Sequence, residues 1–242
     1  MLNCLNLKIE RGKTKVIIGR SGCGKSVTLK HIVGLTRPDS GLVLVDNTDI
    51  SLLGEKELNK IRMRIGVLFQ GGALFDSLTV GENVGFILEE YTDLNRDTVR
   101  KRVTEALGLV GLQGVEERMP AELSGGMKKR VALARSIVMR PEIILYDEPT
   151  TGVDPITADA INELIRELQQ KLEITSVAVT HDIKSAYKIA DTIAMLYQGK
   201  IIAEGSPDEI RNSLDPVVKQ FINGDAVGPI TDAEHLVFGH IE

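Results

Sequence analysis

Residues 19–26 read Gly-Arg-Ser-Gly-Cys-Gly-Lys-Ser and fit the pattern G-x-x-x-x-G-K-S/T at every fixed position. An apolar, β-rich run at residues 15–18 precedes them, and Leu29, Ile32 and Val33 follow at helical spacing. A glycine-rich turn between a strand and a helix can curl until its backbone N–H groups converge on one anion. The pattern therefore predicts a phosphate-binding loop at the start of an α/β unit, because the strand and helix disfavour a plain glycine-rich turn.

Two side chains of this loop carry specific chemistry. Lys25 is placed to reach the β- and γ-phosphates of a nucleotide, and the Ser26 hydroxyl is placed to ligate Mg²⁺. Cys23 fills a variable position, so we interpret it as incidental. We expect the phosphates to contact the whole stretch, which comprises Gly19, Arg20, Ser21, Gly22, Cys23, Gly24, Lys25, Ser26 and Val27.

Composition limits the class of protein. A chain of 242 residues, 43% of them hydrophobic, can form one large domain or a core with an inserted subdomain. A net charge of −5 argues against a nucleic-acid partner. No apolar run approaches the roughly 18 residues that span a bilayer, and the first residues lack a signal-peptide pattern. With only two cysteines and no disulfide framework, we expect a cytoplasmic protein.

The pattern of elements predicts an α/β core with a helical insertion. Strands alternating with helices are typical of a parallel sheet covered on both faces. Thr79 and Glu82 form a capping box at the start of the helical stretch, and Ser124 can cap its last helix. We predict a core at residues 1–71 and 141–215, a helical subdomain at 72–140 and a C-terminal tail at 216–242. Strands are expected at residues 5–10, 42–45, 65–69, 143–146 and 176–179, with a hairpin at 192–204.

Two carboxylates follow the apolar run at residues 143–146. Ligands of open α/β sheets bind at the carboxyl ends of the strands, so Asp147 would hold Mg²⁺ and Glu148 would orient the attacking water. A solvated acidic turn is the alternative, and the phosphate loop upstream disfavours it. Gln70 and His181 end two further strands, and each is uninformative alone but reaches the same edge.

A second anion surface is predicted at Ser124, Gly125 and Gly126. Ser124 is a natural N-cap, and the glycines expose the start of a helix. An ordinary Ser-Gly-Gly turn remains the alternative, because a single γ-phosphate has no need of two such surfaces from one chain.

Taken in order, these motifs resemble the nucleotide-binding subunit of ATP-binding cassette (ABC) transporters. The resemblance covers nearly the whole chain and rests on residues 19–26, Gln70, 123–126, 143–148, 151–154 and His181. It implies a P-loop NTPase fold: a RecA-like parallel sheet core, a small antiparallel β part and an inserted helical subdomain.

The resemblance also implies an ATPase that uses ATP and Mg²⁺. Glu148 and His181 would be catalytic, while Ser26, Gln70 and Asp147 would hold the metal. Gln70, Ser124, Gly125 and Gly126 would complete the nucleotide site. Two copies would pair head to tail, so that residues 124–126 of one copy face Lys25 of the other, and the pair would bind integral-membrane permease subunits at the inner membrane.

A finer resemblance links residues 68–80, 127–130 and 215–229 to the Mla/Mce-type phospholipid transport ATPases. It implies phospholipid cargo and an Mce-type lipid-binding partner. On their own, the charges at Lys128, Lys129 and Arg130 are typical of a solvated helix face. An ABC ATPase for amino acids or metal ions, or a non-transport cassette acting on a cell-envelope complex, stays open. A chromosome or repair cassette ranks last, since no heptad run precedes Ser124.

Two features depart from these patterns. The family has a strand and an adenine-stacking aromatic upstream, but no Phe, Tyr or Trp precedes Gly19 here. Either the start of the chain is truncated or adenine is held otherwise. Beyond Gly224 the tail has no clear period, and it is either disordered or packed on the second copy, where Leu236, Val237 and Phe238 would be covered.

Overall fold

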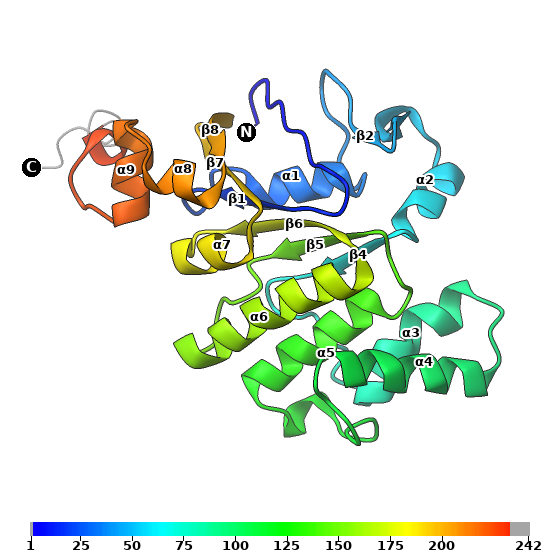
Figure 1. Ribbon diagram of the computed structural model, residues 1–242. Helices are drawn as coiled ribbons and strands as arrows, with labels where there is room; N and C mark the ends of the chain where they lie inside the picture. The colour runs from blue at the N-terminus through cyan, green and yellow to red at the C-terminus, as the bar shows by residue number, and fades with distance from the viewer. Residues whose placement is uncertain (1, 233–242) are drawn as a thin grey trace, which may run out of the picture.

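The computed structural model describes residues 2–232, and a mixed β-sheet lies at its centre (Figure 1). Its six strands are ordered β4-β5-β6-β1-β7-β8 within these residues. The first five are parallel, and β8 runs antiparallel to β7. The strands are β1 (Thr14–Ile18), β4 (Ile65–Leu68), β5 (Ile143–Asp147), β6 (Thr175–Thr180), β7 (Thr192–Tyr197) and β8 (Lys200–Gly205), which confirms the predicted hairpin.

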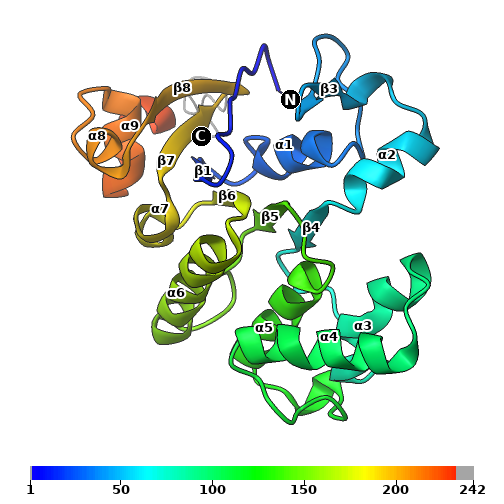
Figure 2. The ribbon, with the colours of Figure 1, turned by 45° about the vertical axis from the view of Figure 1, so that its right-hand side comes forward.

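The strands are apolar because both faces of the sheet are covered. Ile17 of β1 packs with Leu29 of α1 (Lys25–Ile32) on one face. Its neighbours Val16 and Ile18 belong to the cluster on the other face. Figure 2 shows α1 on one side of the sheet and α6 (Pro155–Leu172) and α7 (Ile183–Ile189) on the other. This arrangement places the starts of helices at the carboxyl ends of strands.

Three helices form a group between β4 and β5 in the chain, apart from α1 in both ribbon views (Figures 1 and 2). They are α3 (Val80–Tyr91), α4 (Arg96–Leu109) and α5 (Gly125–Ile137). The predicted capping box of Thr79 and Glu82 is confirmed at α3. Ser124 caps α5 by accepting a hydrogen bond from the Met127 N–H at 3.3 Å. The division into core and helical subdomain stays a prediction.

The N-terminal part differs from the prediction. Residues 5–10 form no strand, because they pair with no sheet edge, and the prediction was wrong. Leu5, Leu7 and Ile9 instead pack on the cluster beneath α1, so their alternation reflects one-sided packing. The predicted strand at 42–45 is shorter, since only β2 (Leu44–Val45) pairs with β3 (Thr48–Asp49).

Short helices were the elements that the sequence pattern did not predict. They comprise α2 (Glu55–Arg62), α7 and α9 (Pro216–Asn223). Helix α8 (Pro207–Arg211) begins after Ser206, which caps it. Short 3₁₀ turns lie at Ile50–Leu52 and Pro120–Glu122. Helix α9 falls in the predicted tail, where Asp215 caps it and Pro216 opens it. Leu236, Val237 and Phe238 lie outside the described residues.

Among residues 2–232, no helix combines the length and the apolar character needed to cross a membrane. Gly66 of β4 packs closely against the helical group, because a Cβ there would lie 2.2 Å from the backbone oxygen of Ser136 in α5.

We expect Gly66→Ala to lower the free energy of unfolding by about 1–3 kcal/mol, because two backbones must move apart. The melting temperature should fall by about 2–4 °C per kcal/mol for a chain of this size. Gly71→Ala is the matched control, since a Cβ at Gly71 meets nothing within 4 Å. Equal melting temperatures for the two variants would contradict the close packing.

Candidate active site

The loop between β1 and α1 has the geometry of an anion site. Gly22 and Gly24 have φ values of 80° and 111°, which favour glycine, and Gly24 precedes α1 without any side-chain cap. At Gly19 a Cβ would lie 2.4 Å from the backbone oxygen of Leu196 in β7, so the loop also packs tightly on the sheet. An uncapped helix start beneath a curled loop fits the phosphates of a nucleotide.

Lys25 folds back over this loop. Its Nζ donates hydrogen bonds to the backbone oxygens of Gly19 at 2.7 Å and Arg20 at 3.1 Å. The same ammonium lies 3.6 Å from Glu148 Oε1. The side chains of Lys25 and Glu148 are only 6% and 10% exposed, so two buried charges neutralise each other at the loop.

A hydroxyl–carboxylate pair joins the phosphate loop to β5. Ser26 Oγ donates to Asp147 Oδ1 at 2.9 Å. Ser26 lies in the first turn of α1, and Asp147 is the last residue of β5. Hard oxygen ligands of this kind suit Mg²⁺ and would neutralise part of its charge. These two residues therefore fit a metal bound together with a nucleotide.

Glu148 is held in place from several directions. Its φ of 49° is left-handed, a conformation that costs a non-glycine residue about 1–3 kcal/mol and is common at functional sites. Thr180 Oγ1 donates to Glu148 Oε2 at 3.1 Å, and Thr151 Oγ1 donates to the same oxygen at 3.3 Å. His181 Nδ1 lies 3.0 Å from the carboxylate. The predicted pair of Glu148 and His181 therefore meets at the ends of β5 and β6.

The signature stretch, residues 123–126, lies outside this cluster of Lys25, Ser26, Asp147, Glu148 and His181. Ser124 and Gly125 are exposed at the start of α5. Gly126 packs on α6, because a Cβ there would lie 2.6 Å from Thr157 Cγ2. Ser124 and Gly125 are thus the part of the stretch that is open to solvent, while Leu123 is buried.

Gln70 reaches the cluster by an indirect contact that the sequence analysis missed. Its backbone oxygen accepts a hydrogen bond from Lys129 Nζ. Burial lowers the pKa of Lys129, while the charges of Glu148 and Asp147 oppose that shift. The Lys129 side chain was expected to belong to a solvated helix face, yet Lys129 is only 7% exposed. The helical spacing could have indicated that Lys129 is buried, because Lys129 shares a helix face with the buried Leu133 and Ser136.

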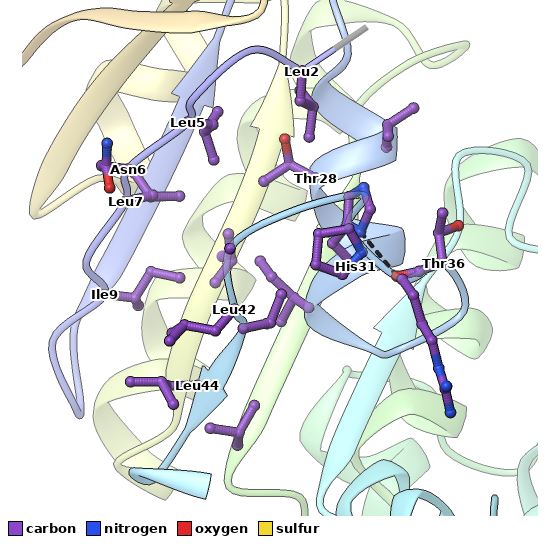
Figure 3. Close-up of a pocket in the computed structure, with 18 of the residues that line it drawn as sticks. Leu2, Leu5, Asn6, Leu7, Ile9, Thr28, His31, Thr36, Leu42 and Leu44 are labelled. Carbon is purple, nitrogen blue, oxygen red and sulfur yellow. Dashed lines mark hydrogen bonds between the residues drawn. The ribbon is translucent and has the colours of Figure 1, made fainter. Parts of the chain in front are cut away.

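A cavity of about 930 Å³ lies elsewhere, between the N-terminal segment and the outer side of α1. Figure 3 shows Leu2, Leu5 and Leu42 around it, with His31 Nδ1 bound to the Thr36 backbone oxygen at 2.8 Å. Its lining contains none of the predicted catalytic or metal-binding residues. The candidate active site is therefore the cluster at the phosphate loop.

A phosphate loop opening α1, with carboxylates at the end of β5, defines a P-loop nucleotide-binding protein. A family model described as ABC transporter matches residues 2–151, so the chain belongs to the ABC transporter family. The resemblance stated from the sequence is confirmed.

Two relatives have names that point to different cargoes. A Mycobacterium tuberculosis protein named as a probable ribonucleotide transport ATP-binding protein is 43% identical over 230 residues. The match covers 95% of this chain but 64% of that relative's length. The intermembrane phospholipid transport system ATP-binding protein MlaF of Haemophilus influenzae is 43% identical over 226 residues, covering 93% of this chain and 86% of that protein.

The fold matches a solved ATP-binding cassette, which was determined as a dimer in a post-hydrolysis state bound to ADP and Pi. The TM-score is 0.77 and the identity 37%, over 85% of this chain and 90% of the other. This likeness confirms the predicted α/β cassette fold with its parallel core and small antiparallel part.

The two cysteines should differ in reactivity. Cys4 is exposed, whereas Cys23 is partly buried in the core cluster beneath the loop. Burial raises the pKa of the Cys23 thiol although Lys25 opposes it, so less reactive thiolate is present at neutral pH. We expect N-ethylmaleimide to label Cys4 at least tenfold faster than Cys23, and the Cys23 rate to rise as the pH increases.

Mass spectrometry of single-cysteine variants, Cys4→Ser and Cys23→Ser, measures the two rates separately. MgATP should slow labelling of Cys23 and leave that of Cys4 unchanged. Lys25→Ala should remove this protection, with Lys30→Ala, an exposed lysine of the same helix, as the control. Protection that persists in Lys25→Ala would contradict the placement of the nucleotide.

Proposed function

We propose that this chain is an ATP-hydrolysing subunit of an ABC transporter that powers phospholipid transport at the inner membrane. The observation that carries the ATPase assignment is the cluster at the phosphate loop, where Lys25, Ser26, Asp147, Glu148 and His181 meet from three elements. Phosphoryl transfer depends mainly on positioning and charge stabilisation, and this cluster supplies both.

The residues of this cluster have different roles in the proposed ATPase. Lys25 binds the nucleotide phosphates, and Ser26 and Asp147 hold Mg²⁺ together with Gln70. When bound, Mg²⁺ supplies charge neutralisation for the phosphates. Glu148 accepts the proton of the attacking water, since Thr180 and His181 fix its carboxylate.

A second copy of the chain completes the site in this proposal. Ser124 and Gly125 are exposed at a helix start, which is suited to the nucleotide of a partner copy. The related cassette solved as a dimer supports such pairing. Each nucleotide would then lie between the phosphate loop of one copy and residues 124–126 of the other.

An apolar surface on the helical group is suited to a permease subunit. Phe69, Phe75 and Phe86 are 47%, 45% and 37% exposed. The rings of Phe75 and Phe86 lie 5.0 Å apart, which makes them a joint contact surface. Phe69 directly precedes Gln70, so a partner docked here would touch the segment next to the active site. In the proposal, the chain lies on the cytoplasmic side, peripheral to the membrane.

Phospholipid is the cargo that we favour. The phospholipid transport relative agrees with the finer resemblance at residues 68–80 and 127–130, and the chain covers 86% of its length. An Mce-type lipid-binding partner would then hand over the lipid. Ribonucleotide transport is the second candidate, because the equally similar mycobacterial relative carries that name.

Glu148→Gln should reduce ATP hydrolysis by at least about a hundredfold, the usual contribution of a general base. The amide still accepts the Thr180 hydrogen bond, so nucleotide binding should persist and a MgATP-bound dimer should accumulate. Phosphate release and size-exclusion chromatography with MgATP measure the two effects.

Glu142→Gln is the matched control, since this carboxylate pairs with Arg64 and Arg11 away from the site. It should hydrolyse ATP at the wild-type rate. Wild-type turnover by Glu148→Gln would refute the assignment of the base, and a dimer that forms without ATP would refute nucleotide-dependent pairing.

The cargo is tested by purifying the full chain in complex with its membrane subunits and extracting the small molecules that remain bound to the complex. Mass spectrometry should find phospholipid, and phospholipid should stimulate ATP hydrolysis in proteoliposomes at least twofold. The same vesicles with an added ribonucleotide serve as the comparison. If hydrolysis in these vesicles rises only when ribonucleotide is added, and ribonucleotide is taken up, the second candidate replaces phospholipid.

A further inference from the structure

Two cations of α5 bind the turn that follows β4. Lys129 Nζ donates to the backbone oxygen of Gln70. Arg135 donates to the backbone oxygens of Gly72 at 2.7 Å and Ala73 at 2.9 Å. Three carbonyls within four residues are therefore held by one helix.

The turn has a shape that needs such support. Gly72 and Ala73 have φ values of 75° and 48°, and a left-handed conformation is costly for Ala73. The Gly72 N–H donates to the Phe69 backbone oxygen at 2.8 Å. A Cβ at Gly72 would lie 3.4 Å from Ala132 Cβ of α5, so the turn lies directly against the helix.

Lys129 is shielded from water, and Arg135 is partly buried. Lys129 is 7% exposed, and burial lowers the pKa of Lys129 and of Arg135. A charged hydrogen bond to a carbonyl is stronger than a neutral one, particularly where water is excluded. The contact with Gln70 is therefore a firm attachment of the turn.

Lys129 is also within electrostatic range of the catalytic carboxylates. The charges of Glu148 and Asp147 oppose the lowering of the Lys129 pKa by burial. Asp147 ends β5 and Glu148 follows it, so the ammonium that binds the turn at Gln70 also interacts with charges at the end of β5. Ser124, which caps the start of the same helix, is exposed.

We propose that Lys129 is a positioning residue that fixes the turn at Gln70 against α5 and so holds the Gln70 side chain toward the Asp147–Glu148 pair. Its effect on turnover rests on the proposed ATPase function. Because Ser124 caps α5, the attachment also connects the turn to the signature stretch through one helix.

The test replaces Lys129 by methionine, which keeps the length of the side chain and removes the donor and the charge. In the full chain, kcat for ATP should fall roughly tenfold, the loss expected for one charged hydrogen bond. KM for ATP should stay within about twofold, because the Lys25 contacts to the loop are intact. The Mg²⁺ concentration for half-maximal rate should rise.

Hydrogen exchange gives a readout that does not need activity. Amides of residues 70–75 should exchange faster in Lys129→Met, while the melting temperature stays close to that of the wild type. Lys129→Arg should restore both exchange and kcat, because its guanidinium can donate to the same carbonyl. Lys128→Met is the control, since its side chain makes no hydrogen bond within residues 2–232. If Lys129→Met fails to fold, Lys129→Leu replaces it, because leucine also lacks a donor.

A double variant tests whether Lys129 acts through Gln70. Gln70→Ala keeps the carbonyl but removes the side chain, so adding Lys129→Met should lower kcat no further. Additive losses in kcat, or unchanged exchange at residues 70–75, would overturn the proposal. If the wild type does not hydrolyse ATP, the proposed function is refuted. Hydrogen exchange at residues 70–75 would still decide whether Lys129 holds the turn.

Discussion

The ion pair of Lys25 and Glu148 and the hydrogen bond of Ser26 to Asp147 hold the active site together. Both contacts join the loop after β1 to the end of β5, although β6 lies between these strands in the sheet. They are available only because parallel strands end at one edge and the loop curls back over it. The sheet order therefore decides which side chains can meet, and the glycines decide how closely the loop approaches them.

The helical group is connected to this site by charge as well as by packing. Lys129 extends from α5 to a carbonyl next to β4, and the carboxylates of β5 attract its ammonium. A cation buried at the junction of two parts of a chain would be costly alone, and these partners offset that cost. The surface carrying Phe75 is continuous with the same turn, so a protein bound there and the nucleotide site share one short segment.

The sequence predicts the active site better than it predicts the periphery. The phosphate loop, Asp147, Glu148 and His181 occupy fixed positions in strand–loop–helix patterns, and the structure brings them together. Residues 5–10 were misassigned because alternation records one-sided burial and cannot tell a paired strand from an unpaired segment. Lys129 was missed because a charged residue is assumed to face water, and only the tertiary contact with Gln70 explains its burial.

The cations of α5 bind backbone oxygens and leave the side chains of the turn untouched. Every residue type except proline presents the same amide and carbonyl groups, so the attachment does not depend on what stands at positions 70–73 beyond their backbone conformation. Neighbouring positions such as Phe75 can therefore carry other side chains while the attachment of the turn to α5 is kept.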